Sequence, residues 1–544
     1  MGHPERAALE RPTGADSPGR LEVEARRRRT FAIISHPDAG KTTLTEKLLL
    51  YGGAIHLAGT VKARRAARHV TSDWMELERE RGISVTSSVL QFDYAGLRVN
   101  LLDTPGHEDF SEDTFRTLVA ADSAVMLLDN RKGVEERTRQ LFEVCRRRRI
   151  PIFTFVNKCD RAGADPLQLV GDVEAELDLQ CVPVTWPVYR EGAFAGVYHR
   201  RRGQVILFAR AGDHGASRAA MHAVPLADPA LDHEVGAEAA RGLREEVALL
   251  DAAGHPFDPA AVLAGDQSPV YFGSALTNFG VEPFLEDYLR LAPAPGPRQA
   301  GDGWVEPTDP RFSAFVFKIQ ANMDPRHRDR VAFLRVCSGR FAPGLPVRVA
   351  RTGRAMKLAA PQQFLGRERL AGEEAWPGDV VGILDRGHLR IGDTLAEWQV
   401  EFSGIPRFPP QHFARVYPAD PLRRKQLDAG LRALSEEGAA QVFFGEGESG
   451  AMPILGAVGL LQFDVMRFRL EHEYGAPCRL KPIAFGHPRW VQGPQAAIER
   501  ASQQAGRLRL FDTRGQPLLL FENPFALRWA LEHEPELVFS EVAP

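Results

Sequence analysis

A short loop between an apolar segment and a helix-forming segment constrains the fold of this chain more than any other feature. Residues 35–42 read Ser-His-Pro-Asp-Ala-Gly-Lys-Thr, after an apolar run at 31–34 and before a helix-like segment at 43–51. A strand, a glycine-containing loop and a helix in this order form a phosphate-binding loop, because backbone N–H groups at the helix start face the anion. Gly40 supplies the tight turn, and Ser35 stands where the general pattern has its first glycine.

Two side chains of this loop have the chemistry that a nucleotide requires. Lys41 is expected to reach the β- and γ-phosphates, and Thr42 to hold Mg²⁺ through its hydroxyl group. The nucleotide-binding residues expected from this loop are Ser35, His36, Pro37, Asp38, Ala39, Gly40, Lys41, Thr42 and Thr43.

A second motif follows a buried-strand pattern at 99–102. It reads Asp103-Thr104-Pro105-Gly106-His107, and all five residues are expected to contact the nucleotide or its surroundings. An aspartate at a strand end beside a phosphate-binding loop is the expected outer ligand of Mg²⁺, and the Gly106 amide can sense a γ-phosphate.

Two more motifs predict recognition of a guanine base. The apolar run 152–156 ends in Asn157-Lys158-Cys159-Asp160, and the Asp160 carboxylate can accept hydrogen bonds from the guanine N1 and N2 groups. The run 270–273 leads into Ser274-Ala275-Leu276, whose backbone can contact the guanine O6. The competing interpretation, ordinary turns between strands and helices, would require all four motifs to coincide in order. We therefore expect a GTPase site, with Asn157, Lys158, Asp160, Ser274, Ala275 and Leu276 on the base side.

The details of these motifs resemble the translational GTPases. Asp-Thr-Pro-Gly-His at 103–107 is similar to the corresponding motif of that superfamily. Glu-Arg-Gly-Ile-Ser-Val-Thr at 80–86 is similar to the superfamily's first switch segment. Within the superfamily, segments 34–43, 81–88, 157–160, 315–325 and 456–465 closely resemble the bacterial class-two peptide chain release factors, release factor three. The resemblance runs from about residue 30 to near the C-terminus.

This resemblance implies a ribosome-activated reaction that converts GTP to GDP and phosphate. It adds Ser84 to Thr42 and Asp103 as a Mg²⁺ ligand; relatives commonly have threonine at that position, and serine keeps the hydroxyl group. It implies three catalytic residues, His107, Gly106 and Asp38. His107 would orient the attacking water, and Asp38 would hold a monovalent cation such as K⁺.

The resemblance also implies the partners. They are the ribosome, through both subunits, ribosomal RNA and stalk proteins, and a class-one release factor that this GTPase would dissociate from the ribosome after termination. The protein is expected to be monomeric and cytoplasmic. An alternative is a translocation or ribosome-protection GTPase resembling elongation factor G, although the chain after the second domain is short for that motor's further domains. A third possibility, a nucleotide-gated docking module with negligible turnover, disagrees with the intact Gly106 and His107.

Composition narrows the class of protein further. The chain contains no apolar run of about 18 or more residues, so no membrane span is expected. A net charge of −3 argues against a nucleic-acid coating protein but permits local basic patches. The five cysteines are scattered without a C-x-x-C spacing, which indicates a reducing compartment and no zinc site.

The predicted fold class is multidomain α/β. A chain of 544 residues suggests about three or four domains. Alternating strand and helix patterns predict a P-loop GTPase domain with an inserted subdomain. The short strands with turns that follow predict a β-barrel domain. The remaining segment mixes helix and strand patterns, which predicts an α+β C-terminal domain. The expected parts are a disordered extension at 1–26, the GTP-binding domain at 27–296 with its insert at about 181–268, the β-barrel domain at 306–400, and the C-terminal domain at 405–544.

Overall fold

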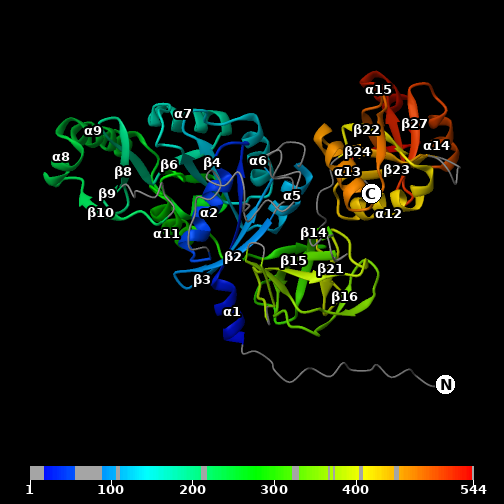
Figure 1. Ribbon diagram of the computed structural model, residues 1–544, viewed down its shortest axis with the longest axis horizontal. Helices are drawn as coiled ribbons and strands as arrows, with labels where there is room; N and C mark the ends of the chain where they lie inside the picture. Colours follow the sequence, from blue (N-terminus) through cyan, green and yellow to red (C-terminus); the bar gives the residue numbers. More distant parts are fainter. Residues whose placement is uncertain are drawn as a thin grey trace.

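The computed structural model describes residues 18–54, 88–105, 111–209, 217–321, 330–365, 368–371, 374–402, 409–445 and 452–541. A mixed sheet with helices lies in the middle of the molecule, and the β-rich second domain lies beside it (Figure 1). The insert and the third domain occupy opposite ends of the long axis (Figure 1). The predicted multidomain α/β fold is confirmed.

The central sheet has seven strands in the order β2-β3-β1-β4-β5-β11-β6. All neighbours are parallel except β2 and β3, which run antiparallel. Loops that follow parallel strands therefore gather at one edge, where ligands of such sheets bind. The strands are β1 (Arg28–Ser35), β2 (Ser88–Tyr94), β3 (Leu97–Asp103), β4 (Ser123–Asp129), β5 (Ile152–Asn157), β6 (Gln180–Pro183) and β11 (Gln267–Phe272).

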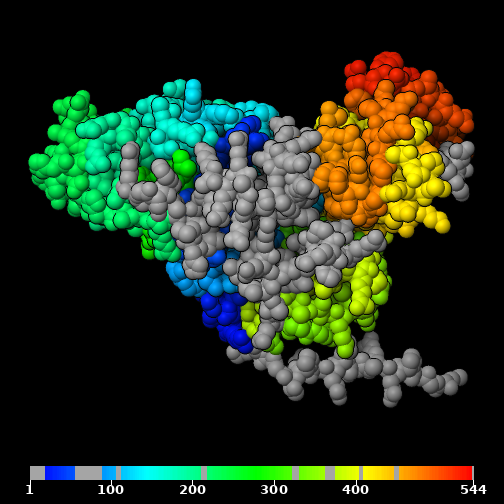
Figure 2. Space-filling view, in the orientation of Figure 1, coloured from blue at the N-terminus to red at the C-terminus, as the bar shows by residue number. Residues whose placement is uncertain are grey.

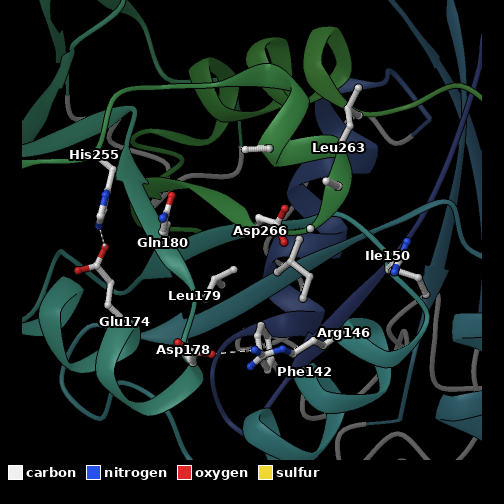
Figure 3. Close-up of a pocket in the computed structure, with 15 residues that line it drawn as sticks. Phe142, Arg146, Ile150, Glu174, Asp178, Leu179, Gln180, His255, Leu263 and Asp266 are labelled. Atoms are coloured by element: carbon white, nitrogen blue, oxygen red, sulfur yellow. Dashed lines mark hydrogen bonds and ion pairs between the residues drawn. The ribbon is translucent and has the colours of Figure 1, made fainter.

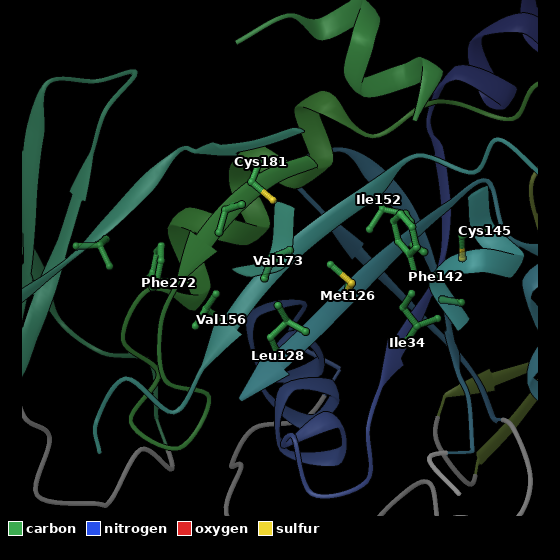
Figure 4. Packing of buried hydrophobic residues seen from close by; sticks show 14 of the residues in the cluster. Ile34, Met126, Leu128, Phe142, Cys145, Ile152, Val156, Val173, Cys181 and Phe272 are labelled. Carbon is green, nitrogen blue, oxygen red and sulfur yellow. The ribbon is translucent and has the colours of Figure 1, made fainter. Parts of the chain in front are cut away.

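Helices cover both faces of this sheet because its strands are apolar on both sides. In β4, Met126 and Leu128 face one hydrophobic core, while Val125 and Leu127 face the other. The first core includes side chains of α5 (Ser111–Ala120), α6 (Glu136–Arg147) and α7 (Pro166–Leu177), and Figure 4 shows Phe142 and Cys145 of α6 against this layer. The second includes side chains of α2 (Lys41–Tyr51) and α11 (Val281–Leu291).

The insert is built on a separate four-stranded antiparallel sheet in the order β10-β9-β8-β7. Residues 181–183 and 267–268, which the sequence assigned to the insert, belong instead to β6 and β11 of the central sheet, so the predicted insert was too wide at both ends. The elements between them are β7 (Thr185–Arg190), β8 (Ala193–His199), β9 (Gln204–Phe208), β10 (Met221–Pro225), α8 (Ala230–Val235), α9 (Ala237–Ala253) and α10 (Pro259–Ala264).

Residues 18–26 form helix α1 (Pro18–Arg26), so the prediction of a disordered extension through residue 26 was wrong for this part. Leu21 and Ala25, one helical turn apart, are both buried. The Arg20 guanidinium lies 5.0 Å from the centre of the Trp376 ring in the second domain. The charged composition suggested disorder, but an apolar pair on one face and a partner in another domain give the helix a surface to pack on.

The second domain is an eight-stranded antiparallel sheet in the order β17-β16-β21-β14-β15-β20-β18-β19. It encloses a core that includes Val316, Leu334 and Leu395. A two-stranded sheet of β12 and β13 precedes it. The strands are β12 (Arg298–Ala300), β13 (Gly303–Val305), β14 (Ser313–Ala321), β15 (Arg330–Ser338), β16 (Pro346–Val349), β17 (Ala355–Lys357), β18 (Gln362–Leu365), β19 (Glu368–Ala371), β20 (Val380–Leu384) and β21 (Thr394–Ala396).

The third domain is an eight-stranded sheet, β25-β22-β24-β23-β27-β28-β26-β29, with helices packed against it. Its elements are β22 (His412–Pro418), the 3₁₀-helix η2 (Pro421–Arg423), α12 (Arg424–Glu436), β23 (Gln441–Gly445), β24 (Ile454–Ala457), α13 (Leu460–His472), β25 (Cys478–Pro482), β26 (His487–Gln492), α14 (Gln495–Ser502), β27 (Arg507–Asp512), β28 (Pro517–Phe521), α15 (Pro524–His533) and β29 (Val538–Ser540). Among the helices of the described ranges, none combines the length and apolar character that crossing a bilayer requires.

Candidate nucleotide-binding site

The phosphate-binding loop joins the end of β1 to the start of α2, as the sequence predicted. Gly40 precedes α2 with a left-handed backbone, φ 100°, and accepts the first helical hydrogen bond from the Leu44 N–H group at 2.9 Å. A Cβ atom at Gly40 would lie 2.3 Å from Nδ2 of Asn157. Glycine is therefore required here both by the backbone angle and by a neighbouring side chain.

The Gly40→Ala variant is expected to bind GDP much more weakly than the wild type, because Asn157 must move and the loop opens. Gly53→Ala is the matched control, since Gly53 also has a positive φ of 70° but has open space where a Cβ would lie. Each variant should lose about 1–3 kcal/mol of stability from backbone strain. Isothermal titration with GDP should separate them, and equal affinities would contradict the close approach of Asn157.

Asn157 ties the phosphate-binding loop to the loop after β11. Its Nδ2 donates to the Ala39 carbonyl at 2.8 Å, and its Oδ1 accepts from the Ala275 N–H group at 2.8 Å. Lys158 makes a further hydrogen bond to the phosphate-binding loop, because its Nζ donates to the Asp38 carbonyl. Residues from three of the predicted motifs thus meet at one edge of the sheet.

Asp129, at the end of β4, is a residue of this network that the sequence analysis did not find. Its Oδ2 accepts from Lys158 Nζ at 2.7 Å. Burial opposes ionisation of Asp129, but hydrogen bonds from Lys158 and from the Arg131 backbone outweigh it, so the pKa of Asp129 lies below its usual range. The sequence feature that could have identified Asp129 is its position at the end of the buried apolar strand β4.

Asp160 lies beside Ser274, which brings the two predicted base-recognition motifs together. Ser274 Oγ donates to Asp160 Oδ1 at 2.5 Å, and the Ser274 N–H group donates to the Phe279 carbonyl at 2.8 Å. Asp160 is half-buried, and Leu276 is exposed. One carboxylate oxygen of Asp160 is thus held by Ser274, and the other lies 4.0 Å from Arg161 Nε.

Lys41 and Asp103 form a buried ion pair where a phosphate and its metal ion are expected. Lys41 Nζ donates to Asp103 Oδ1 at 2.6 Å, and the two side chains are only 8% and 2% exposed. The Ser35 Oγ atom nearby is buried without a hydrogen-bond partner in the described residues. Thr104 is fixed by donating to the Ile33 carbonyl at 2.7 Å.

This arrangement fits Mg²⁺ bound together with a substrate phosphate. Mg²⁺ usually takes one or two protein oxygens and completes its coordination with water and phosphate. Asp103 supplies a carboxylate, and Thr42 lies in the first turn of α2. Within the described ranges, no group of three His, Cys, Asp or Glu side chains forms a metal site independent of a ligand. Ser84, Gly106 and His107 lie outside the described residues.

A separate cavity lies at the opposite edge of the sheet from these loops. It has a volume of about 1050 Å³ and is lined by the starts of β5, β6 and β11, including Ile152, Gln180 and Asp266. Figure 3 shows two contacts here, the ion pair of Arg146 with Asp178 and the contact of His255 with Glu174. This cavity therefore lies at the ends of the strands away from the predicted nucleotide-binding motifs.

Helix α5, which begins eight residues after Asp103, contacts both other domains. Lys318 of the second domain lies 3.5 Å from Asp113. In the third domain, the Gly438 carbonyl accepts from Arg116 at 3.1 Å, and Gln441 donates to Glu112 at 3.0 Å. Helix α5 thus contacts both other domains and follows the Asp103 motif in the chain.

Comparison with protein families assigns each part of the chain. Residues 26–294 match the Elongation factor Tu GTP binding domain, residues 311–398 match Elongation factor G domain 2, and residues 402–531 match the Class II release factor RF3, C-terminal domain. A peptide chain release factor 3 from Symbiobacterium thermophilum is 54% identical over 96% of this chain and 99% of its own length. The chain belongs to the peptide chain release factor 3 family.

Further family members agree with this assignment. Relatives of the same name from Gloeothece citriformis and a Cyanothece species are 50% and 49% identical, covering 96% and 97% of this chain and 97% and 98% of their own lengths. A crystal structure of a Thermus thermophilus protein is similar in fold, with a TM-score of 0.67 and 25% identity over 89% of this chain and 72% of that chain. The predictions of a translational GTPase and of a role in translation termination are confirmed.

Proposed function

We propose that this chain uses GTP binding and hydrolysis on the ribosome to promote departure of a class-one peptide release factor after termination. The observation that best supports this role is that helix α5, whose Thr114 Oγ1 donates to the Pro105 carbonyl at 3.3 Å, also contacts both other domains. Helix α5 follows Asp103 and contacts Lys318 of the second domain and Gly438 of the third. A switch acts on a partner only if its nucleotide states differ in affinity for that partner, and these contacts give a route for such a difference.

The nucleotide would be held by the four predicted motifs. Lys41 leaves Asp103 to neutralise the β- and γ-phosphates, while Asp160 and the loop at 274–276 read the guanine base. Mg²⁺, with Thr42, Ser84 and Asp103 as its protein ligands, would supply charge neutralisation on the phosphates. The hydrogen bonds from Asn157 and Lys158 to the phosphate-binding loop hold these loops in place, so that the loops need little rearrangement when the nucleotide binds.

Hydrolysis would depend on residues next to the γ-phosphate. The Gly106 amide senses that phosphate, and His107 orients the attacking water. Asp38 is exposed, and its backbone is left-handed with φ 67°, a conformation that aspartate adopts more readily than most residues. We propose that it holds a monovalent cation such as K⁺ near the phosphates.

The partners would be both ribosomal subunits, ribosomal RNA, the stalk proteins and a class-one release factor. The insert, with α8 and α9 at the far end of the long axis, is the part we propose for the stalk contact (Figure 1). The protein would act as a monomer in the cytoplasm.

Dissociation of a labelled class-one factor from ribosomes halted at a stop codon tests the proposal. Wild-type protein with GTP should accelerate the dissociation. A variant that binds GTP but does not hydrolyse it should accelerate one round and then stay on the ribosome. If the wild-type protein leaves the dissociation rate of the class-one factor unchanged and instead drives movement of tRNA, the alternative role resembling elongation factor G is favoured.

A further inference from the structure

The base loop, residues 273–280, packs against the insert through an aromatic contact. The Phe279 ring stacks on Phe208 of β9, with ring centroids 4.9 Å apart and an angle of 17° between the ring planes. The ring of Phe194, in β8, lies 6.2 Å from the same Phe279 ring. All three rings are buried. The insert therefore contacts the loop that carries the predicted contacts to the guanine O6 atom.

Hydrogen bonds join the insert to the chain at both ends of the base loop. After the predicted guanine contacts, Asn278 Nδ2 donates to the Ser217 carbonyl of the insert at 2.5 Å. Just before the loop, the Phe272 N–H group donates to Thr185 Oγ1 of β7 at 2.9 Å. The insert thus supports the base loop at its start, at its end and through the Phe279 ring.

The same loop is connected to the carboxylate that is predicted to read the guanine base. The Phe279 carbonyl accepts from the Ser274 N–H group at 2.8 Å, and Ser274 Oγ donates to Asp160 Oδ1 at 2.5 Å. Contacts therefore lead from Phe208 in the insert, through Phe279 and Ser274, to Asp160.

The GTP-binding domain also holds the base loop, because Asn157 Oδ1 accepts from the Ala275 N–H group at 2.8 Å. The insert therefore contributes part of the support and not all of it. Loosening one wall of a binding site acts mainly on the rate at which the ligand leaves. We propose that the insert sets the lifetime of bound guanine nucleotide, with Phe208 and Phe279 as positioning residues for the base loop. This inference rests on the proposed contact of residues 274–276 with guanine.

The insert is placed so that its movement can reach the nucleotide. Figure 2 shows it as a green lobe that projects at one end of the molecule, with its outer surface open to solvent in this view. A displacement of this lobe would shift β9 and loosen the Phe279 contact, and nucleotide release would become faster. Because coupling between two sites is reciprocal, the bound nucleotide would in turn change how readily the lobe moves.

Release of a fluorescent GDP analogue from the full chain, with Mg²⁺ and without ribosomes, tests the proposal. Excess unlabelled GDP starts the reaction, and stopped-flow fluorescence follows it. Phe208→Ala should release the analogue about tenfold faster than the wild type, as expected for loss of a strong aromatic contact. The association rate should change by less than about twofold.

Leu231→Ala is the matched control, because it truncates a fully buried side chain of α8, at the far end of the insert (Figure 1). It should release the analogue at the wild-type rate. Phe208→Leu is a milder variant that fills most of the space but removes the stacked ring. It should accelerate release about threefold, and it replaces Phe208→Ala if heat unfolding shows that the alanine variant does not fold.

Phe279→Leu tests the same contact from the side of the loop. If Phe208 acts through Phe279, the two leucine substitutions together should release the analogue about as fast as the faster single variant. The proposal is overturned if the two effects multiply, if the Phe208 variants release at the wild-type rate, or if Leu231→Ala accelerates release equally.

Asp160→Asn in the same assay separates this proposal from the proposed base recognition. If Asp160→Asn binds GDP as tightly as the wild type, the assignment of the base-recognition site fails, and the inference about the insert fails with it. If Asp160→Asn loses GDP affinity while the Phe208 variants release the analogue at the wild-type rate, only the inference about the insert fails.

Discussion

The His107→Ala variant should bind GTP nearly as tightly as the wild type and lose ribosome-stimulated hydrolysis by about 10²- to 10⁴-fold. Our proposal gives His107 a role only when the attacking water is being positioned, so the loss should appear in turnover and not in affinity. Single-turnover hydrolysis with and without ribosomes, together with equilibrium GTP binding, measures both quantities.

His233→Ala is a suitable control for this variant, because His233 is an exposed residue of the insert, far from the predicted motifs in the sequence. It should hydrolyse GTP at the wild-type rate. Turnover of His107→Ala within a few-fold of the wild type would remove His107 from the mechanism. A parallel loss of GTP affinity would show instead that the histidine supports binding.

The Asp160→Asn variant should lose GTP affinity and gain affinity for xanthosine triphosphate. The carboxylate accepts hydrogen bonds from guanine N1 and N2, and loss of these charged bonds costs about 2–3 kcal/mol. The amide of asparagine can instead donate to the extra carbonyl oxygen of xanthine. Competition between the two nucleotides, measured by displacement of a fluorescent analogue, gives the change in preference directly.

Asp172→Asn provides the same change of charge at an exposed position on α7, and it should leave both affinities unchanged. Ser274 offers an additional check, because it holds Asp160 through a 2.5 Å hydrogen bond. Ser274→Ala should weaken GTP binding less than Asp160→Asn does. An unchanged GTP affinity in Asp160→Asn would overturn the assignment of the base-recognition site.

The sequence predicted which motifs lie together where a short motif follows a buried strand. Ser35, Asp103 and Asn157 each end a parallel strand, and parallel strands bring their carboxyl ends to one edge. The order of motifs along the chain therefore translates into proximity in space. The residue assignments themselves remain proposals, and Ser84, Gly106 and His107 lie outside the described part of the chain.

Contacts between domains could not be predicted from the sequence. Arg116 and Gly438 are 322 positions apart, and nothing local in either segment indicates the other. Helix α1 was missed for a similar reason, because its partner Trp376 lies in the second domain. Asp129 was missed because a single aspartate after a strand is common, and only the hydrogen bond to Lys158 distinguishes it.

The five cysteines have a practical consequence for experiments on this protein. All are free and buried. Burial raises the pKa of the Cys145, Cys159 and Cys337 thiols to about 12 and that of Cys478 to about 11, and it raises the pKa of Cys181 as well. Because the thiolate is the reactive form, maleimide dyes should label these positions slowly.

A cysteine placed at an exposed position should therefore be labelled selectively in the otherwise natural sequence. Glu238→Cys in the insert and Glu532→Cys in the third domain would put a donor and an acceptor dye at opposite ends of the molecule. Energy transfer between them could then follow the relative movement of these domains during a single encounter with a ribosome.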